Sequence, residues 1–463
     1  MSTGTISGAV SRVVEPGTES RRTAWGLTSL LVVLYVVNYA DKAVLGIIAQ
    51  PVAQELGLSS SQIGLVGSLF FLTFTIGGFF AGAINKWMTL RWALVVLALC
   101  WSVAMLPMVV VATFVVLIGS RLFLGLAEGP SSALVHTAAY SWHAPERRGL
   151  PGALIAGAAS ISKIAVAPAL AFITVTWGWR AALIALSIAG LVWCVVWLAV
   201  WKEGPYIAGK KAGGKKAVAA ADEEGVGEEA VVPAATEPHV PWIRIFTTRT
   251  FVSGVFLVMS VYALVTVVLT WLPSYFEVGL GYSRLQAGSM FAFPSIAGLA
   301  LMLLTSSVGD RLITRGATSR VIRVIVPATG VLICGAILFM LPSISTPGLA
   351  VLVVSVGYGF AASVFPLLNA AISEICPPRQ TAGTLGVFMA IMAIGGLVAP
   401  YATGLIVDAA STPAAGYATA FQALGVVAAV CALAALLLAD PERDKALVRG
   451  VAPSAIEAPG AAK

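Results

Sequence analysis

Hydrophobic residues in this chain gather into runs of about 20 residues, which short polar segments separate. A helix of this length crosses the hydrocarbon core of a bilayer, so each run predicts one membrane-spanning helix. We expect the first six spans at 25–48, 60–84, 91–112, 114–137, 150–173 and 179–201. We expect the second six at 250–275, 285–308, 321–342, 346–373, 381–407 and 416–439. The pattern predicts an all-α polytopic membrane protein with twelve transmembrane helices in two six-helix halves.

Composition supports this interpretation and removes several other classes of function. Of the 463 residues, 59 % are hydrophobic and 11 % are charged, whereas soluble globular proteins have about 25 % charged residues. The net charge of +7 comes from basic residues scattered among short connections, so no nucleic-acid-binding surface is expected. The five cysteines lie in or at the ends of apolar runs, where they resemble core residues rather than metal ligands. We find no catalytic, metal or cofactor motif and therefore expect neither an enzyme nor a cofactor-binding protein.

The polar segments between and beyond the runs predict how the chain is divided. Residues 1–24 are expected to be a disordered cytoplasmic tail, 440–463 a second cytoplasmic tail, and 202–248 a cytoplasmic linker between the halves 25–201 and 249–439. Lysine and arginine are concentrated in the connections on one side of the predicted membrane, for example Lys86, Arg147, Arg148 and Arg379. Because cytoplasmic loops are enriched in basic residues, both termini are expected in the cytoplasm. We predict a multi-pass protein of the cell (inner, cytoplasmic) membrane that acts as a monomer.

The two predicted halves repeat one another in sequence. Three pairs of matching residues are each 232 positions apart, namely Gly125 and Gly357, Pro145 and Pro377, and Pro168 and Pro400. Duplicated halves of this kind are a transporter architecture, in which the substrate site lies where the halves meet. The repeat is broken at two charged positions, because Arg121 corresponds to Val353 and Glu128 to Phe360. Function is therefore expected to depend on charges that the first half alone carries.

Arg121 and Glu128 lie in the middle of the fourth predicted span. A charged side chain at the centre of a bilayer costs roughly 2.5–3.5 kcal/mol on insertion scales. Their spacing of seven residues is two helical turns, so the two side chains project from nearly the same face. We expect this face to point toward a partner helix, a cavity or a proton path instead of lipid.

A polar stripe lies in the first predicted span. Tyr35, Asn38, Tyr39 and Lys42 follow the spacing i, i+3, i+4, i+7 and share one helix face. Asp41 directly precedes Lys42. Two interpretations stay open, since the stripe is either part of a substrate and proton site, or an internal Asp41–Lys42 pair that only holds helices together.

Five short motifs along the chain carry a family resemblance: Asn38-Tyr39-Ala-Asp41-Lys42, Arg121-x-x-x-Gly125-x-x-Glu128-x-Pro130, Trp271-Leu-Pro273-x-Tyr275, Gly309-Asp310-Arg311 and Gly395-Gly396-x-x-Ala-Pro400. They are similar to motifs of the major facilitator superfamily and, within it, of the anion:cation symporters, which carry sugar acids and other organic anions. The resemblance implies the twelve-helix fold of that superfamily, two halves that rock about a central site, and a gating loop at Asp310 and Arg311. The chain departs from the family at Lys42, where an arginine is usual; lysine keeps the charge but loses the planar fork that grips a carboxylate.

Lys163 in the fifth predicted span is the residue that the resemblance does not explain. Its repeat partner is Gly395, and the family usually has a small residue at this position. A lysine in an apolar span is expected to face a cavity or a carboxylate. Two interpretations stay open: Lys163 is a second anchor for an anionic substrate, or it is a structural partner of Asp41 or Glu128.

Other polar side chains are candidates of lower rank. Tyr262 and Asn369 are expected to contact substrate from the second half. Trp271 and Tyr275 lie near a predicted span end, where interfacial anchoring is expected. His136 is eight residues beyond Glu128 and is expected to have a role in the loop at the end of its span.

Together these features predict a proton-coupled symporter of a small organic anion that works by alternating access. Lys42, with Lys163, would attract the carboxylate, and Asp41 and Glu128 would be the protonatable pair, with Arg121 holding Glu128 ionised until substrate or proton arrives. Methionines and alanines in the eleventh span favour an aromatic or short aliphatic carboxylate over a polyhydroxylated one. The alternatives are an exporter or anion exchanger on the same fold, or a membrane sensor without transport.

Overall fold

The structure is a computed structural model that describes residues 18–143, 149–202, 204, 240–344, 346–377 and 380–450. In these residues all regular elements are helices. Twelve helical stretches are long and apolar enough to cross a membrane. The predicted fold class and the predicted number of spans are thereby confirmed.

The first half contains six spans, several of which are broken into shorter helices. They are α1 (Thr18–Leu56), α2 (Ser60–Gly78) with α3 (Ala81–Trp87), α4 (Leu90–Ala104) with α5 (Leu106–Val110), α6 (Phe114–Glu128) with α7 (Ser131–Tyr140), α8 (Gly149–Ile161) with the π-helical turn η2 (Ser162–Val166) and α9 (Ala167–Trp177), and α10 (Trp179–Val200). The breaks follow the sequence, since Pro107 and Pro168 each begin a helix segment, where the missing N–H is not needed.

The second half repeats the arrangement. It comprises α12 (Trp242–Phe246), α13 (Arg249–Ser274) with η3 (Tyr275–Gly279), α14 (Arg284–Met290) with α15 (Phe293–Thr314), η4 (Val321–Ile325) with α16 (Val326–Met340) and the short turn η5 (Leu341–Ser343), α17 (Pro347–Ala362) with α18 (Val364–Ile375), α19 (Thr381–Ala409), α20 (Pro413–Leu438) and α21 (Pro441–Arg449).

Three helices extend into segments that were expected to be tails or a linker. Helix α1 begins at Thr18 inside the predicted first tail, α12 lies in the predicted linker, and α21 lies in the predicted second tail. The rest of the predicted tails and most of the linker lie outside the described residues. The proposed division into two tails, a linker and two halves therefore stays a prediction for those parts.

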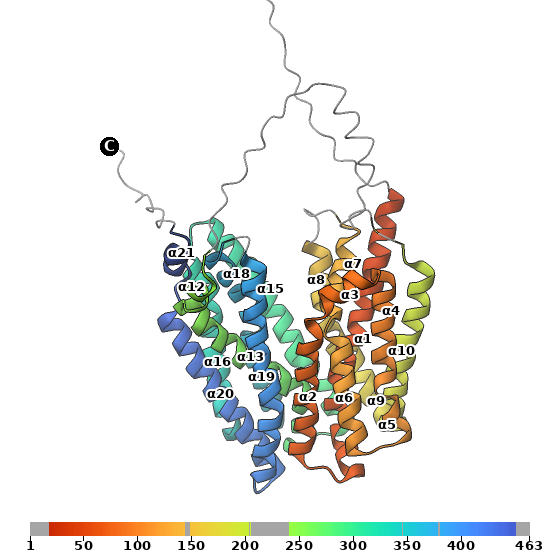
Figure 1. Cartoon of the computed structure of the whole chain (residues 1–463). Coiled ribbons are helices and arrows are strands. Elements are labelled where there is room, and N and C mark those ends of the chain that lie inside the picture. Colours follow the sequence, from red (N-terminus) through yellow and green to blue (C-terminus); the bar gives the residue numbers. More distant parts are fainter. Residues whose placement is uncertain are drawn as a thin grey trace, which may run out of the picture.

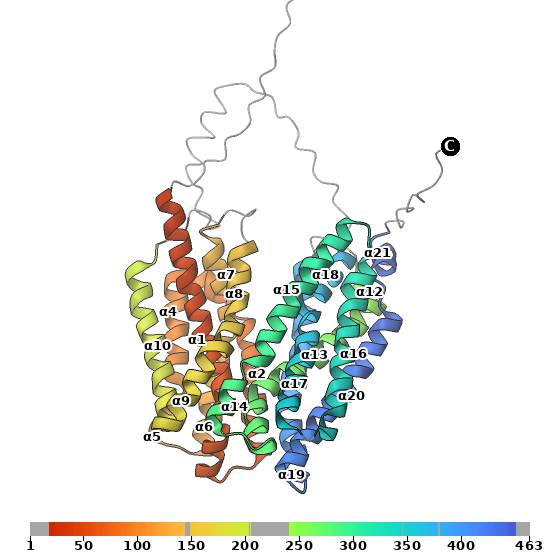
Figure 2. The same cartoon turned by 180° about the vertical axis from the view of Figure 1, so that it is seen from behind.

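The halves touch at one end of the molecule and diverge toward the other, as both views show (Figures 1 and 2). The touching pairs are α2 with α19, α1 with α13, and α9 with α14. We call this end the contact end, and the opposite end, where α12 and α21 lie, the tail end. Glycine permits the close approach, because it has no side chain. A Cβ atom added at Gly64 would collide with the backbone oxygen of Pro400, and one added at Gly404 would collide with the backbone of Ser60.

A carboxylate from the second half caps a helix of the first half at the contact end. Asp408 of α19 accepts hydrogen bonds from the backbone N–H groups of Ser60 (2.8 Å) and Ser61 (2.7 Å), the first two residues of α2. The first N–H groups of a helix have no partner within the helix, and the helix dipole favours an anion there. Asp408 thus ties the two halves through one side chain.

Replacing Asp408 with alanine is expected to loosen the contact end. A lost helix cap costs about 1 kcal/mol, which shifts a two-state equilibrium about fivefold. Spin labels at the exposed Gln54 and Ser411 should show a larger fraction of long distances in Asp408→Ala than in the parent protein. Glu55→Ala is the matched control, because Glu55 binds Arg180 and Trp179 of its own half. Equal distance changes in both variants would contradict a specific tie by Asp408.

Candidate functional site

Helix α1 turns its polar stripe into the interior of the first half. Lys42 donates a hydrogen bond from Nζ to the side-chain oxygen of Asn38, one turn earlier on the same helix. The Lys42 Nζ atom lies 4.6 Å from the ring centre of Tyr39 and 4.9 Å from that of Phe74. Tyr35, further along the stripe, is 5.8 Å away. The cation is thus surrounded by aromatic faces, which favour a positive charge.

Glu128 is the ion-pair partner of Lys42. Its Oε2 lies 3.1 Å from Lys42 Nζ, with the Glu128 side chain fully buried and that of Lys42 6 % exposed. The pair joins α1 to the last residue of α6. Lys42 thus pairs with Glu128 and not with Asp41, the partner that its sequence neighbourhood had left open. The expected role of Arg121 in holding Glu128 ionised stays a prediction.

Arg121 is buried and forms a second link between α6 and α1. Its Nη1 donates to the backbone oxygen of Asp41 at 3.1 Å, and its guanidinium lies 4.5 Å from the ring centre of Phe70. Arg121 is 1 % and Asp41 5 % exposed. Inside the first half, two cations and two carboxylates are therefore buried close to one another on two helices.

Lys163 occupies the π-helical turn η2 and reaches toward the other half. It is 7 % exposed, and its Nζ lies 5.6 Å from the ring centre of Tyr358 on α17. Within the described residues Lys163 has no ion pair and no hydrogen bond from its side chain. Of the two interpretations left open, a structural pair of Lys163 with Asp41 or Glu128 is therefore not found, and an anchor for an anionic substrate stays a prediction.

Lys163 and its repeat counterpart lie in different backbone conformations. Its counterpart Gly395 lies in the uninterrupted helix α19, where an added Cβ would meet the backbone oxygen of Met259 on α13. A lysine in the same register of a regular helix would therefore collide with the neighbouring helix. Lys163 lies instead in a π-helical turn, and such turns are frequent at functional sites.

Two residues near the polar stripe of α1 were not expected at the site. Phe74 is an ordinary apolar residue in the sequence, and nothing in its spacing marks it. His136 was expected in a span-end loop, but it lies within α7, with its ring centre 6.4 Å from that of Tyr35. That expectation assumed a continuous helix, whereas the chain breaks between α6 and α7 and the helical angle from Glu128 does not carry over.

The candidate residues of the second half lie in different places in the structure. Tyr262 lies at the interface, its ring centre 6.2 Å from that of Phe71 in the first half. Asn369 lies on α18, beyond the break that separates this helix from α17, and its contact with substrate stays a prediction. Trp271 and Tyr275 are buried, 1 % and 3 % exposed, and their expected role as interfacial anchors is wrong.

Trp271 instead packs between helices, since its Nε1 donates to the backbone oxygen of Pro400 at 3.0 Å. The predicted gating residues Asp310 and Arg311 lie in the last part of α15 rather than in a loop. Arg311 is exposed, and the side chain of Asp310 lies outside the described set. Their gating role stays a prediction.

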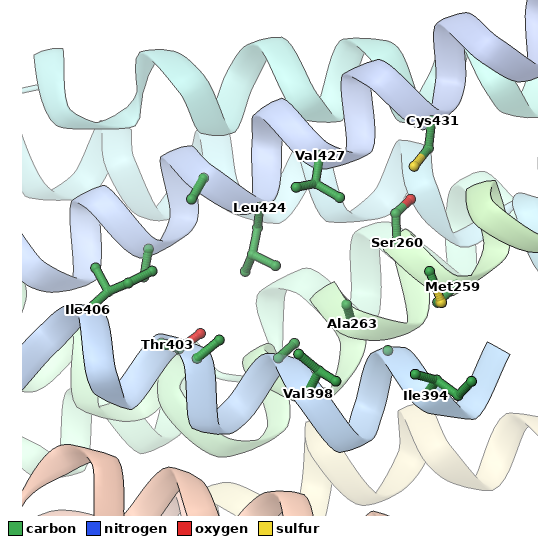
Figure 3. Close-up of a pocket in the computed structure, with 15 residues that line it drawn as sticks. Met259, Ser260, Ala263, Ile394, Val398, Thr403, Ile406, Leu424, Val427 and Cys431 are labelled. Carbon is green, nitrogen blue, oxygen red and sulfur yellow. The ribbon is translucent and has the colours of Figure 1, made fainter. Parts of the chain in front are cut away.

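A separate apolar pocket of about 280 Å³ lies between α13, α19 and α20 (Figure 3). Ile394, Val398, Leu424 and Val427 line it, with Ser260 among the few polar groups. None of the predicted site residues borders this pocket, so it is distinct from the charged cluster. Among the described residues no group of three or more His, Cys, Asp or Glu is placed to hold a metal ion.

A family model described as Major Facilitator Superfamily matches residues 31–364 and 323–458. The chain belongs to the Major Facilitator Superfamily. It is 26 % identical to the probable galactarate/D-glucarate transporter of Bacillus subtilis, over 92 % of this chain and 94 % of that protein. It is 25 % identical to the hexuronate transporter of the same bacterium, over 88 % and 92 %, and to a probable sulfoacetate transporter of Cupriavidus necator, over 89 % and 93 %.

Solved structures agree with the superfamily fold. A bacterial homologue of the human lysosomal transporter Spinster, in an inward-facing and occupied conformation, has a TM-score of 0.70 at 15 % identity, covering 89 % of this chain and 96 % of that one. A D-xylose-proton symporter has a TM-score of 0.70 at 16 % identity, covering 91 % and 99 %. This superfamily member is a multi-pass membrane transporter and not an enzyme.

Removing Lys42 is expected to destabilise this transporter strongly. Lys42→Met leaves Glu128 buried without its ion-pair partner, and breaking a buried pair from one side costs about 3–5 kcal/mol. The double variant Lys42→Met/Glu128→Gln removes both charges and should recover much of the loss. Thermal unfolding in detergent measures the stability of both variants. The loss of stability in Lys42→Met should be larger in alkaline than in acidic buffer, because protonation of Glu128 removes the unpaired charge. A double variant no more stable than Lys42→Met would contradict the pairing.

Proposed function

We propose that this transporter is a proton-coupled symporter of a small organic anion and that Lys163 holds the anion. The observation that carries the proposal is the charge balance of the spans. Among the buried side chains described within the membrane spans, Asp41 and Glu128 offset Lys42 and Arg121, and Lys163 remains as one surplus positive charge. A buried ammonium without an acid partner is costly unless an anion neutralises it.

The position of Lys163 suits a site shared by the two halves. It comes from the first half and contacts Tyr358 of the second. An anion held there would touch both halves at once, as alternating access about a central site requires. One more buried donor, Nε of Arg121, forms no hydrogen bond within the described residues and could serve a polar ligand.

The Lys42–Glu128 pair supplies a route for coupling to protons. When Glu128 takes up a proton, Lys42 loses its carboxylate partner and becomes free to attract an anion. By linkage, an anion that binds beside Lys42 favours proton uptake by Glu128 to the same extent. Asp41, whose backbone is fixed by Arg121, is the second carboxyl of the proposed proton site. One proton and one monovalent anion would then cross together without net charge.

The proposed substrate class is a carboxylate with an aromatic or short aliphatic body. The aromatic groups Tyr39, Phe74 and Tyr358 surround the two lysines, and Tyr35 and Tyr262 are close to this region. Relatives named as transporters of galactarate/D-glucarate, hexuronate and sulfoacetate support an anionic substrate in general. Both termini are proposed to lie in the cytoplasm of a cell whose inner membrane holds the protein as a monomer.

Uptake into proteoliposomes tests the proposal. A panel of labelled sugar acids, aromatic acids and short aliphatic acids is offered with and without an inward proton gradient. Accumulation of a carboxylate that depends on the gradient supports symport. Uptake that depends on substrate inside the vesicle instead would identify an anion exchanger, and a tenfold preference for hexonates would contradict the proposed substrate class.

Glu128→Gln is expected to separate transport from coupling. Glutamine cannot carry the proton, so accumulation driven by a pH gradient should be abolished. Binding and counterflow of the substrate should persist, because the amide can still accept a hydrogen bond from Lys42. Gradient-driven accumulation at the parental level would exclude Glu128 from the coupling step.

Lys163→Met is expected to weaken substrate binding about ten- to a hundredfold, because a charge-assisted hydrogen bond worth about 1.5–3 kcal/mol is lost. Lys163→Arg keeps the charge and should retain part of the affinity. Apparent affinity measured against pH gives the decisive readout, since loss of an anchor lowers affinity equally at every pH. A displaced pH profile with undiminished maximal affinity would show that Lys163 acts on the carboxyl groups instead.

A further inference from the structure

A cavity of about 420 Å³ at the tail end is lined by three arginines. Arg244 comes from α12, Arg249 is the first residue of α13, and Arg443 comes from α21. The cavity lies on the second half, where α12 and α21 sit on the side away from the first half (Figures 1 and 2). It is therefore remote from the proposed transport site.

The acidic groups near this cavity leave two arginines unneutralised. Asp444 lines the cavity, is 1 % exposed, and binds both Arg443 (2.8 Å) and the backbone N–H of Thr250 (2.8 Å). Within the described residues, Arg244 and Arg249 form neither an ion pair nor a side-chain hydrogen bond. The lining thus carries two surplus positive charges.

Two other acids, Asp440 just before α21 and Glu442 in its first turn, are engaged away from the cavity. Asp440 pairs with Arg320 at 3.5 Å, and Glu442 accepts a hydrogen bond from the backbone N–H of Ser319 at 2.7 Å. They offer no partner to the two unneutralised arginines. An anion in the cavity would therefore meet guanidinium groups, which bind phosphate oxygens in a bidentate manner.

An apolar surface continues from the arginines into the membrane. Val252 and Phe256 follow Arg249 at i+3 and i+7 on the membrane-crossing helix α13 and are 43 % and 50 % exposed. Beside the cavity, Ile243 is 69 % and Leu447 66 % exposed. A soluble anion would leave this apolar surface uncovered, whereas an acyl chain attached to the anion would cover it.

We propose that Arg244, Arg249 and Arg443 form a headgroup site for an anionic phospholipid, whose acyl chains lie along α13. Basic pockets between membrane helices are suited to phosphate headgroups. The lipid would join α12, the start of α13 and α21 through one phosphate. The site is independent of the proposed transport function, because it lies on the outer side of one half.

Native mass spectrometry of the whole protein with added lipid tests the proposal. The parent protein is expected to bind phosphatidylglycerol in preference to phosphatidylcholine. Arg244→Gln and Arg249→Gln should each weaken phosphatidylglycerol binding about fivefold, and Arg249→Lys should weaken it less. Arg315→Gln is the matched control, since Arg315 is an exposed arginine directly after α15 without a side-chain partner in the described residues.

Three outcomes would overturn the site. Equal weakening by Arg315→Gln would mean that general surface charge attracts the lipid. Equal binding of phosphatidylglycerol and phosphatidylcholine would mean that the headgroup charge is not recognised. Displacement of the lipid by millimolar inorganic phosphate, with equal thermal stabilisation by phosphate alone, would identify a soluble-anion site. Thermal midpoints of all variants in phosphatidylcholine verify that each one is folded.

Discussion

The ion pair between Lys42 and Glu128 is the constraint around which the first half is built. A carboxylate that is fully buried at the level of a membrane needs a cation beside it, and that requirement places α6 directly against α1. Arg121 adds a second link between the same helices through the backbone of Asp41. Because both links join the same two helices, four buried charged groups of this half are concentrated on α1 and α6, whereas Lys163 lies apart from them in sequence, in the turn η2.

The two repeated halves differ at the position of Lys163. In the second half, Gly395 lets α19 lie against the backbone of α13. In the first half, the equivalent position holds Lys163, and the helix there contains a π-helical turn. The same duplicated scaffold thus provides close helix packing in one half and an available ammonium in the other. The halves meet at the contact end through glycine and the Asp408 cap, and Lys163 adds a contact across the boundary through Tyr358.

Sequence reasoning was accurate for features that depend on local pattern and less accurate for features that depend on which helix lies opposite. The polar stripe of α1 and the buried pair in α6 were identified from spacing and from the cost of charge in lipid. The ion-pair partner of Glu128 was not identified from the sequence, because Lys42 and Arg121 are both cations inside the spans and either could have paired with it. The role of Trp271 was predicted wrongly for a similar reason. A tryptophan near a span end can lie at the membrane–water interface or, as here, donate a hydrogen bond to the backbone oxygen of Pro400 on a neighbouring helix.

The sequence by itself determined the twelve membrane spans, their duplication and the set of charges that the bilayer would force inward. These follow from hydrophobic run length and from the high free energy of a charge in hydrocarbon, both of which act residue by residue. Only the tertiary structure decided that Lys42 neutralises Glu128, that Lys163 faces Tyr358 without an acid partner, and that Asp408 caps α2. Each of these depends on contacts between helices far apart in the chain, and the breaks and turns that aim the side chains are set by packing against neighbouring helices.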